Sequence, residues 1–261
     1  QAITGGNPLL DPETADTLTF GFVYTPEFVP NLSVSIDYFN IVVEDTISAG
    51  LPAQQVLDQC LATGLDAFCG LITRGAGGTL AGGSPGVGFQ STNINIAELE
   101  TTGIDVQVIY DWDLGEHSLR FDYAATILDA LDTTPGPGLD VIECAGFFGN
   151  TCGSPSPEYR HRFLATWNTP WDVDVTTTWR HFGATDVDTA AETVETELHD
   201  TNNIDVSANW YVTEDIVIRG SVLNLFGEDP PIYSSAGPAL GNGNTYPTVF
   251  DTSRVFVAAV K

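Results

Sequence analysis

Three arginines near the ends of two neighbouring strand-like runs are the residues whose type and spacing best fit a binding site. Folding the chain back at the turn between the runs sets Arg160 opposite Arg180, with Arg162 diagonal to it. Like charges that face each other across two strands are unfavourable unless an anion compensates them. We therefore expect these arginines either to pair with carboxylates such as Asp122 or Asp205, or to contact an anionic substrate.

An acidic stretch between residues 186 and 197 is a second candidate for chemistry. Its carboxylates belong to Asp186, Asp188, Glu192, Glu195 and Glu197. Calcium needs several oxygen ligands that converge on one point. The stretch lacks the DxDxDG pattern of a calcium loop, so the sequence favours a solvated acidic loop, and no metal site is predicted.

The four cysteines form two close pairs, Cys60 with Cys69 and Cys144 with Cys152. Neither pair has CxxC spacing or a nearby histidine, which argues against zinc. Two local disulfides formed in an oxidising compartment fit this spacing best. Free structural thiols are the alternative.

No set of residues predicts catalysis. The four histidines (His117, His161, His181 and His199) stand in no metalloprotease motif, and neither a nucleophile elbow nor a phosphate-binding loop occurs. The chain has 8 Lys or Arg against 35 Asp or Glu, a formal net charge of -27, whereas nucleic-acid binding needs clustered cations. We expect no enzyme, no cofactor and no nucleic-acid partner.

Short runs rich in β-branched and aromatic residues predict an all-β fold. These runs lie near residues 16–25, 32–46, 97–112, 117–128, 158–168, 172–183, 201–211, 215–225 and 253–260. The connections alternate in length: 26–30 is short, and 48–96 is long and contains a predicted short helix at 52–60. Outer-membrane β-barrels have short periplasmic turns and long extracellular loops, while a sandwich has no reason to keep this order.

The hairpin registers support a barrel. Folding back at residues 169–171 and 212–214 gives the pairs Trp167–Val173, Ala165–Val175, Phe163–Thr177, Trp210–Ile216, Ala208–Ile218 and Ile204–Val222. Apolar side chains then share one face of each hairpin, and a slip of one residue would invert every side chain. We expect the apolar face, for instance Ile104, Val106, Val108 and Tyr110, to point to lipid rather than to pack between two sheets.

Aromatic residues flank the short turns. They are Tyr24, Tyr110, Trp112, Trp167, Trp171, Trp210 and Tyr211, and they include four of the five tryptophans. Trp and Tyr prefer the membrane–water interface. The alternative is a set of core aromatics at one end of a sandwich.

Several stretches resemble the C-terminal barrel of TonB-dependent receptors, in the order of that family. They are Gly6 to Pro26 (GNPLLDPETADTLTFGFVYTP), Leu32 to Ile47, Asn95 to Trp112, Pro157 to Gly183, and Val222 to Pro231 (VLNLFGEDPP) with a closing strand after Phe250. The resemblance covers nearly the whole chain, although each motif is weak alone.

The resemblance implies a fold and a function. The family encloses a globular N-terminal plug in a 22-stranded antiparallel transmembrane barrel, and its TonB box receives energy from the inner membrane. Residues 1–261 would form about nine C-terminal strands of such a barrel in the bacterial outer membrane, without plug or TonB box. Its edge strands, near residues 17–24 and 254–260, would pair with other parts of the barrel.

The function implied is TonB-dependent uptake of a scarce nutrient, such as a ferric siderophore or an oligosaccharide. The implied partners are the rest of the barrel and its plug, the TonB complex, the nutrient and outer-membrane lipid. The lumen-facing contacts with substrate or plug would be Arg160, Arg162, Arg180, Asp122 and Asp205. The alternatives are a passive porin-type barrel and a secreted β-sandwich used in adhesion or assembly.

Overall fold

The structure is a computed structural model that describes residues 2–3, 5–48, 53–80, 86–149, 151–188, 196–233, 246, 249 and 254–260. The chain divides into two compact units. The first comprises Gln1–Thr17, Ile41–Thr101 and Leu131–Ile142, and the second comprises Leu18–Asn40, Thr102–Ala130 and Glu143–Lys261.

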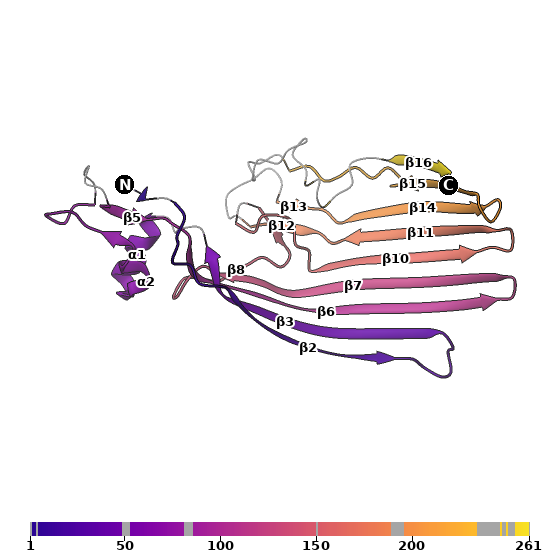
Figure 1. The fold of residues 1–261 in the computed structure, drawn as a ribbon, viewed down its shortest axis with the longest axis horizontal. Helices are drawn as coiled ribbons and strands as arrows, with labels where there is room; N and C mark the ends of the chain where they lie inside the picture. Colours follow the sequence, from indigo (N-terminus) through magenta and orange to yellow (C-terminus); the bar gives the residue numbers. More distant parts are fainter. Residues whose placement is uncertain are drawn as a thin grey trace. The chain divides into compact units, whose positions relative to one another are not determined.

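Nine strands form one antiparallel sheet, and their order across the sheet is their order along the chain (Figure 1). They are β2 (Thr14–Tyr24), β3 (Leu32–Ser48), β6 (Ile94–Leu114), β7 (His117–Thr134), β10 (Tyr159–Asn168), β11 (Val173–Phe182), β14 (Thr201–Tyr211), β15 (Val217–Leu223) and β16 (Val255–Val260). The short strand β8 (Ile142–Glu143) pairs with β7. Each predicted run corresponds to one of the nine strands, so the all-β prediction is confirmed.

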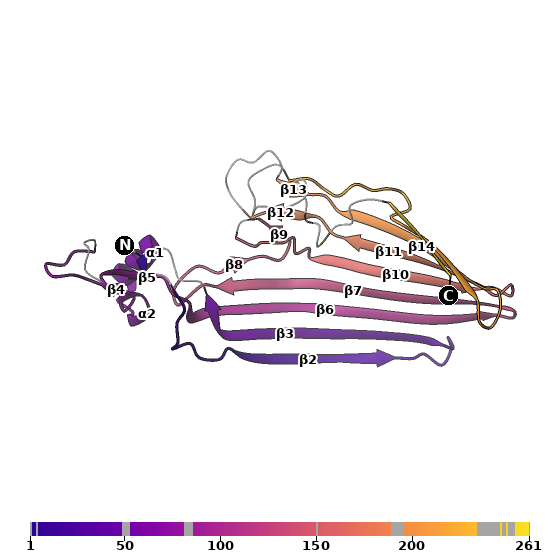
Figure 2. The same ribbon diagram turned by 45° about the horizontal axis from the view of Figure 1, so that its top comes forward.

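The short connections β2–β3, β6–β7, β10–β11 and β14–β15 lie together at one end of the sheet (Figures 1 and 2). The β6–β7 connection is the tightest, with two residues between Leu114 and His117. Gly115 takes a φ of 76° there, a left-handed conformation that glycine adopts without steric cost. The predicted alternation of short and long connections is confirmed.

The register of β10 and β11 differs from the predicted one by two residues. Trp167 pairs with Val175 rather than with Val173. The hydroxyl of Thr169 donates to the carbonyl of Val173 at 2.8 Å and accepts the Val173 N–H at 3.3 Å, and Asp172 takes a φ of 56°. The loop therefore consists of residues 170–172 instead of 169–171. Moving a loop by one residue shifts the strand pairing by two.

The β14–β15 hairpin shows the same correction, with Trp210 opposite Ile218 rather than Ile216. The hydroxyl of Thr213 accepts the Ile216 N–H at 3.1 Å, and the Val212 N–H donates to the Ile216 carbonyl at 2.9 Å. These bonds close the loop one residue later than predicted. Because both shifts are by two residues, every side chain stays on its predicted face.

The apolar face of the main sheet is turned outward. Ile127, Trp179 and Trp210 lie on strands inside the sheet and are 45%, 39% and 49% exposed. Side chains this exposed are not packed between two sheets. The prediction of an outward apolar face is confirmed, and the β-sandwich interpretation is wrong.

The first unit contains a small module between β3 and β6. Its elements are α1 (Ala53–Thr63), α2 (Asp66–Cys69), β4 (Ile72–Thr73) and β5 (Gly88–Gln90), with β1 (Ala2–Ile3) beside β5. Val56 and Phe68 are fully buried and pack with Phe89, so the module has its own apolar core. The predicted helix is present as α1, with Pro52 outside the described residues. No described helix has the length and apolar character needed to cross a membrane.

The second unit carries another small sheet beyond the long-loop ends of the strands. It consists of β9 (Phe147–Phe148), β12 (Thr185–Val187) and β13 (Glu197–Leu198). Phe148, Leu198, Tyr233 and Tyr246 form its buried cluster, in which the ring of Phe148 meets both tyrosine rings edge to face. This cluster gives the loops of the second unit a core of their own.

Candidate functional site

The polar face of the main sheet is cross-linked by side chains near the short turns. Arg120 donates two hydrogen bonds to Asp111, at 3.0 and 2.9 Å. Asn168 donates to the hydroxyl of Ser118 at 2.8 Å, on the neighbouring strand. These charged and amide side chains therefore have partners within the sheet.

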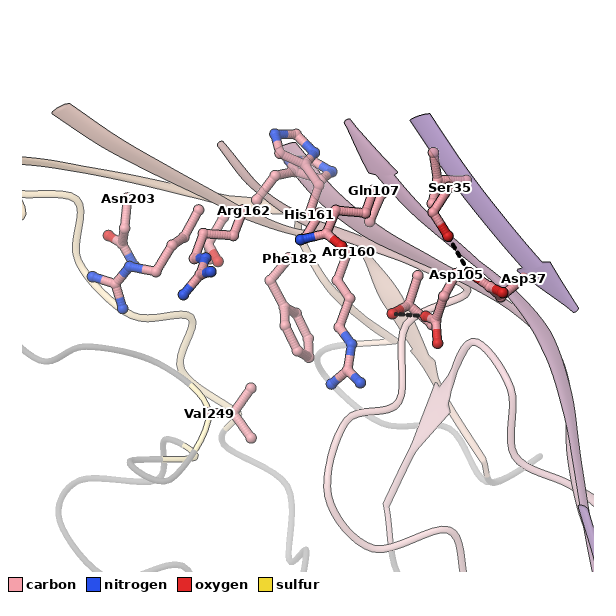
Figure 3. A pocket seen from close by; sticks show the side chains of 17 residues that line it. Ser35, Asp37, Asp105, Gln107, Arg160, His161, Arg162, Phe182, Asn203 and Val249 are labelled. Carbon is pink, nitrogen blue, oxygen red and sulfur yellow. Dashed lines mark hydrogen bonds between the residues drawn. The ribbon is translucent and has the colours of Figure 1, made fainter. Parts of the chain in front are cut away.

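Farther from the short turns, the same face is hollowed into a cavity of about 550 Å³ (Figure 3). Strands β3, β6, β7, β10, β11 and β14 all contribute residues to it. Its Asp and Arg side chains are Asp37, Asp105, Arg160, Arg162 and Arg180. The three arginines predicted as a cluster are thus brought together in one place.

The pairing of these arginines corrects the prediction. Arg162, not Arg160, lies directly opposite Arg180, and Arg160 lies opposite Phe182. The cause is the two-residue shift of the β10–β11 hairpin. The like-charged pair predicted from the sequence is present, with one partner exchanged for the arginine two residues away on the same face.

Arg180 is held by a carboxylate on the next strand. Its guanidinium donates to Asp205 at 2.9 Å, and the other carboxylate oxygen of Asp205 accepts the backbone N–H of Asn224 at 2.8 Å. The Asp205 side chain is only 16% exposed, and Asn224 is buried. Of the two carboxylates named as compensating partners, Asp205 does pair with an arginine.

Asp122 does not take that role. It lies opposite Leu164 on β10, and one of its carboxylate oxygens is buried without a hydrogen-bond partner. Arg160 and Arg162 are exposed, and neither forms a hydrogen bond or ion pair with any described residue. Two of the three predicted arginines therefore keep their donors available inside the cavity.

Sequence reasoning missed the acidic side of the cavity. The hydroxyl of Ser35 donates to Asp37, and the hydroxyl of Thr126 donates to Asp105 at 2.7 Å (Figure 3). Alternation along LSVSIDY places Ser35 and Asp37 on the polar face, so the sequence held a signal for them. That β3, β6 and β10 share one cavity is visible only in the folded sheet.

A second cluster lies on the apolar face behind the arginines. Figure 3 shows His161 on the opposite side of β10 from Arg160. Its ring contacts Tyr159 at 5.5 Å, Trp179 at 4.4 Å and His181 at 5.2 Å between centroids. Neither ring nitrogen of His161 has a hydrogen-bond partner among the described residues, so ring packing alone holds it. These aromatic side chains lie at the opposite end of the strands from the aromatic residues of the short turns.

Both predicted disulfides are present. The sulfur–sulfur distances are 1.98 Å for Cys60–Cys69 and 2.03 Å for Cys144–Cys152, and no described cysteine is free. The free-thiol alternative is wrong. Each bond closes a local loop, as the spacing indicated.

The acidic stretch is part of the loop structure around the second disulfide. The Asp188 carboxylate accepts the backbone N–H groups of Thr151 and Cys152 at 2.7 and 2.6 Å. Asp186 of β12 and Glu197 of β13 lie opposite each other in the strand register, while Glu192 and Glu195 lie outside the described residues. Within the part of the chain that is described, no three His, Cys, Asp or Glu residues are placed to hold a metal ion.

Comparisons with known proteins agree with this geometry. The ferric enterobactin receptor of Pseudomonas aeruginosa, in a mutant form, superposes with a TM-score of 0.65 at 14% identity, covering 98% of this chain and 32% of that one. The siderophore receptor PirA of Acinetobacter baumannii gives 0.63 at 14%, with 98% and 32% covered. The FrpB iron transporter of Neisseria meningitidis gives 0.58 at 12%, with 99% and 32% covered.

These similarities concern the fold, and the chain spans about a third of the length of each of these three solved proteins. No curated protein sequence matches it. The family described as TonB dependent receptor-like, beta-barrel matches residues 1–225. The chain therefore belongs to the TonB-dependent receptor β-barrel family, whose members lie in the outer membrane of Gram-negative bacteria.

Proposed function

We propose that this chain is the C-terminal part of the barrel of an outer-membrane transporter that takes up a scarce nutrient with energy from the TonB complex. The observation that carries the proposal is the match of the family to residues 1–225. The outward apolar face and the hollowed polar face support it, because a membrane barrel needs an apolar exterior and a polar interior. The chain acts as a transporter and not as an enzyme.

The remaining strands and the plug come from the rest of the same barrel. The sheet has β2 and β16 at its edges. Unpaired backbone groups in hydrocarbon each cost several kcal/mol, so these edge strands pair with further barrel strands. The plug then fills the lumen against the polar face.

The arginines of the cavity make the contact with cargo or plug. Arg160 and Arg162 have exposed guanidinium groups without partners among the described residues, and guanidinium recognises carboxylates and phosphates through paired hydrogen bonds. An anionic chelate or an acidic sugar provides such groups. Asp205 positions Arg180 for the same contact.

Two measurements on the full-length polypeptide test the proposal. A plugged transporter, once purified in detergent, gives no steady conductance in a planar lipid bilayer. Cells that express it take up the nutrient only when TonB is present. Steady open-channel conductance together with TonB-independent uptake would identify a porin and refute the proposal.

A further inference from the structure

The charges of the lumenal cavity are separated by sign. Its guanidinium groups lie on β10 and β11, and its carboxylates, Asp37 and Asp105, lie on β3 and β6. Strand β7 runs between the two groups and contributes no charged side chain to the cavity. The two sides of one cavity therefore attract opposite charges.

The geometry of the sheet keeps the two sides apart. Arg160 lies opposite Thr126 of β7, and the hydroxyl of Thr126 donates to Asp105 of β6. Neighbouring strands are spaced by about 4.8 Å, so the backbones at Arg160 and Asp105 are roughly 10 Å apart. No ion pair joins the two sides among the described residues.

On the polar face two arginines are neutralised from an adjacent strand, one outside the cavity and one inside it. Arg120 on β7 binds Asp111 on β6, and Arg180 on β11 binds Asp205 on β14. Asp37 and Asp105, by contrast, receive only hydroxyl donors within the described residues, from Ser35 and Thr126. A carboxylate can accept several hydrogen bonds, so Asp37 and Asp105, which both line the cavity, keep acceptor capacity.

We propose that this cavity binds an amphoteric ligand, one that carries an anionic group and a cationic group on the order of 10 Å apart. The anionic group binds Arg160 and Arg162, and the cationic group binds Asp37 and Asp105. A cavity of about 550 Å³ lies within the size range of small-molecule sites. This inference rests on the proposed transport function and specifies the class of its cargo.

The test uses the full-length receptor and three ferric linear trihydroxamates. One carries a terminal ammonium, the second a terminal carboxylate, and the third carries both groups at opposite ends. Dissociation constants are measured by quenching of tryptophan fluorescence in detergent. We expect the probe with both groups to bind about tenfold more tightly than either of the others, since each charged contact adds affinity.

Two variants test which cavity side chain binds each charged group of the probe. Asp105→Asn should abolish the advantage of the doubly charged probe over the carboxylate probe, and Arg162→Gln should abolish its advantage over the ammonium probe. Arg120→Gln is the matched control, because Arg120 lies on the same face, bonds Asp111 and does not line the cavity. It should leave all three dissociation constants unchanged.

Three results would overturn the inference: equal binding of the doubly and singly charged probes, no binding of any probe, or retained discrimination in both cavity variants. A fourth is the appearance of conductance in Arg162→Gln, which would assign the arginines to the plug. None of these refutes transport, because TonB-dependent uptake is measured separately in cells. Uptake that does not require TonB, together with steady conductance, would refute the proposed function instead.

Discussion

Removing the carboxylate of Asp205 should destabilise the barrel by an amount that depends on what replaces it. Asp205 compensates Arg180, which faces Arg162 directly, and it also binds the backbone N–H of Asn224. Asp205→Asn removes the charge but keeps an oxygen that can accept the Asn224 N–H. Asp205→Ala removes both.

The magnitudes follow from exposure. The side chain of Arg180 is 40% exposed, so loss of the ion pair alone is worth about 0.2–1 kcal/mol. The repulsion between Arg162 and Arg180, which Asp205 no longer offsets, adds a few tenths, giving about 1 kcal/mol for Asp205→Asn. Asn224 is 1% exposed, and losing its bond to a charged acceptor costs about 1.5–3 kcal/mol. Asp205→Ala should therefore cost about 3 kcal/mol.

The assay is the free energy of unfolding of the full-length barrel, measured by tryptophan fluorescence in urea and detergent micelles. Asp111→Asn is the matched control, because the Asp111–Arg120 pair is about half exposed on both sides and should contribute about 0.5 kcal/mol. Arg162→Gln in the Asp205→Asn background should recover part of the loss, since it removes the repelling charge. Equal effects of Asp205→Asn and Asp111→Asn, together with no recovery from Arg162→Gln, would refute the reasoning.

Three further outcomes are expected. Replacing Cys60 and Cys69 by serine should destabilise the loop module by about 2–3 kcal/mol, seen as faster hydrogen exchange in α1 and α2; unchanged exchange would contradict it. Gly21→Ala should lower the unfolding free energy by about 1–3 kcal/mol, because its Cβ would lie 2.5 Å from the Ile36 carbonyl oxygen; Gly220→Ala, where no atom lies within 4 Å, is the control and should be neutral or slightly stabilising. Burial of Tyr246, and to a lesser degree the nearby Tyr233 and Asp188, raises the pKa of its phenol above the ordinary 10.0, so the folded loops favour the neutral phenol. The stability of these loops should be full below pH 10 and should fall as the pH rises further, which is measured as a faster proteolysis rate. Tyr246→Phe should remove this pH dependence.

The strand order and the faces of the sheet could be predicted because both depend on short-range patterns. Alternation with a period of two assigns each side chain to a face. The lengths of the connections follow directly from the spacing of the strand-like runs in the sequence. Neither signal requires knowledge of which residue lies opposite which.

The register of the hairpins could not be predicted because it depends on one-residue differences in the turns. Thr169 and Thr213 each close a loop through a hydroxyl. The composition of a turn does not show which of its residues closes the loop. The two-residue shift in register changed the site, because it placed Arg162 instead of Arg160 opposite Arg180. The acidic side, Asp37 with Asp105, needed pairings across four strands, which the sequence does not specify locally.

The placement of the scarce cations gives the strongest physical argument that the polar face binds something anionic. The chain has 8 Lys or Arg against 35 Asp or Glu, so an arginine at a random position would find a carboxylate within reach. Yet Arg160 and Arg162 form an ion pair with no carboxylate of the described residues, although both share one cavity with Arg180. A chain this acidic leaves two neighbouring guanidinium groups uncompensated at a cost. We propose that an anionic group on the cargo or on the plug removes that cost when it binds.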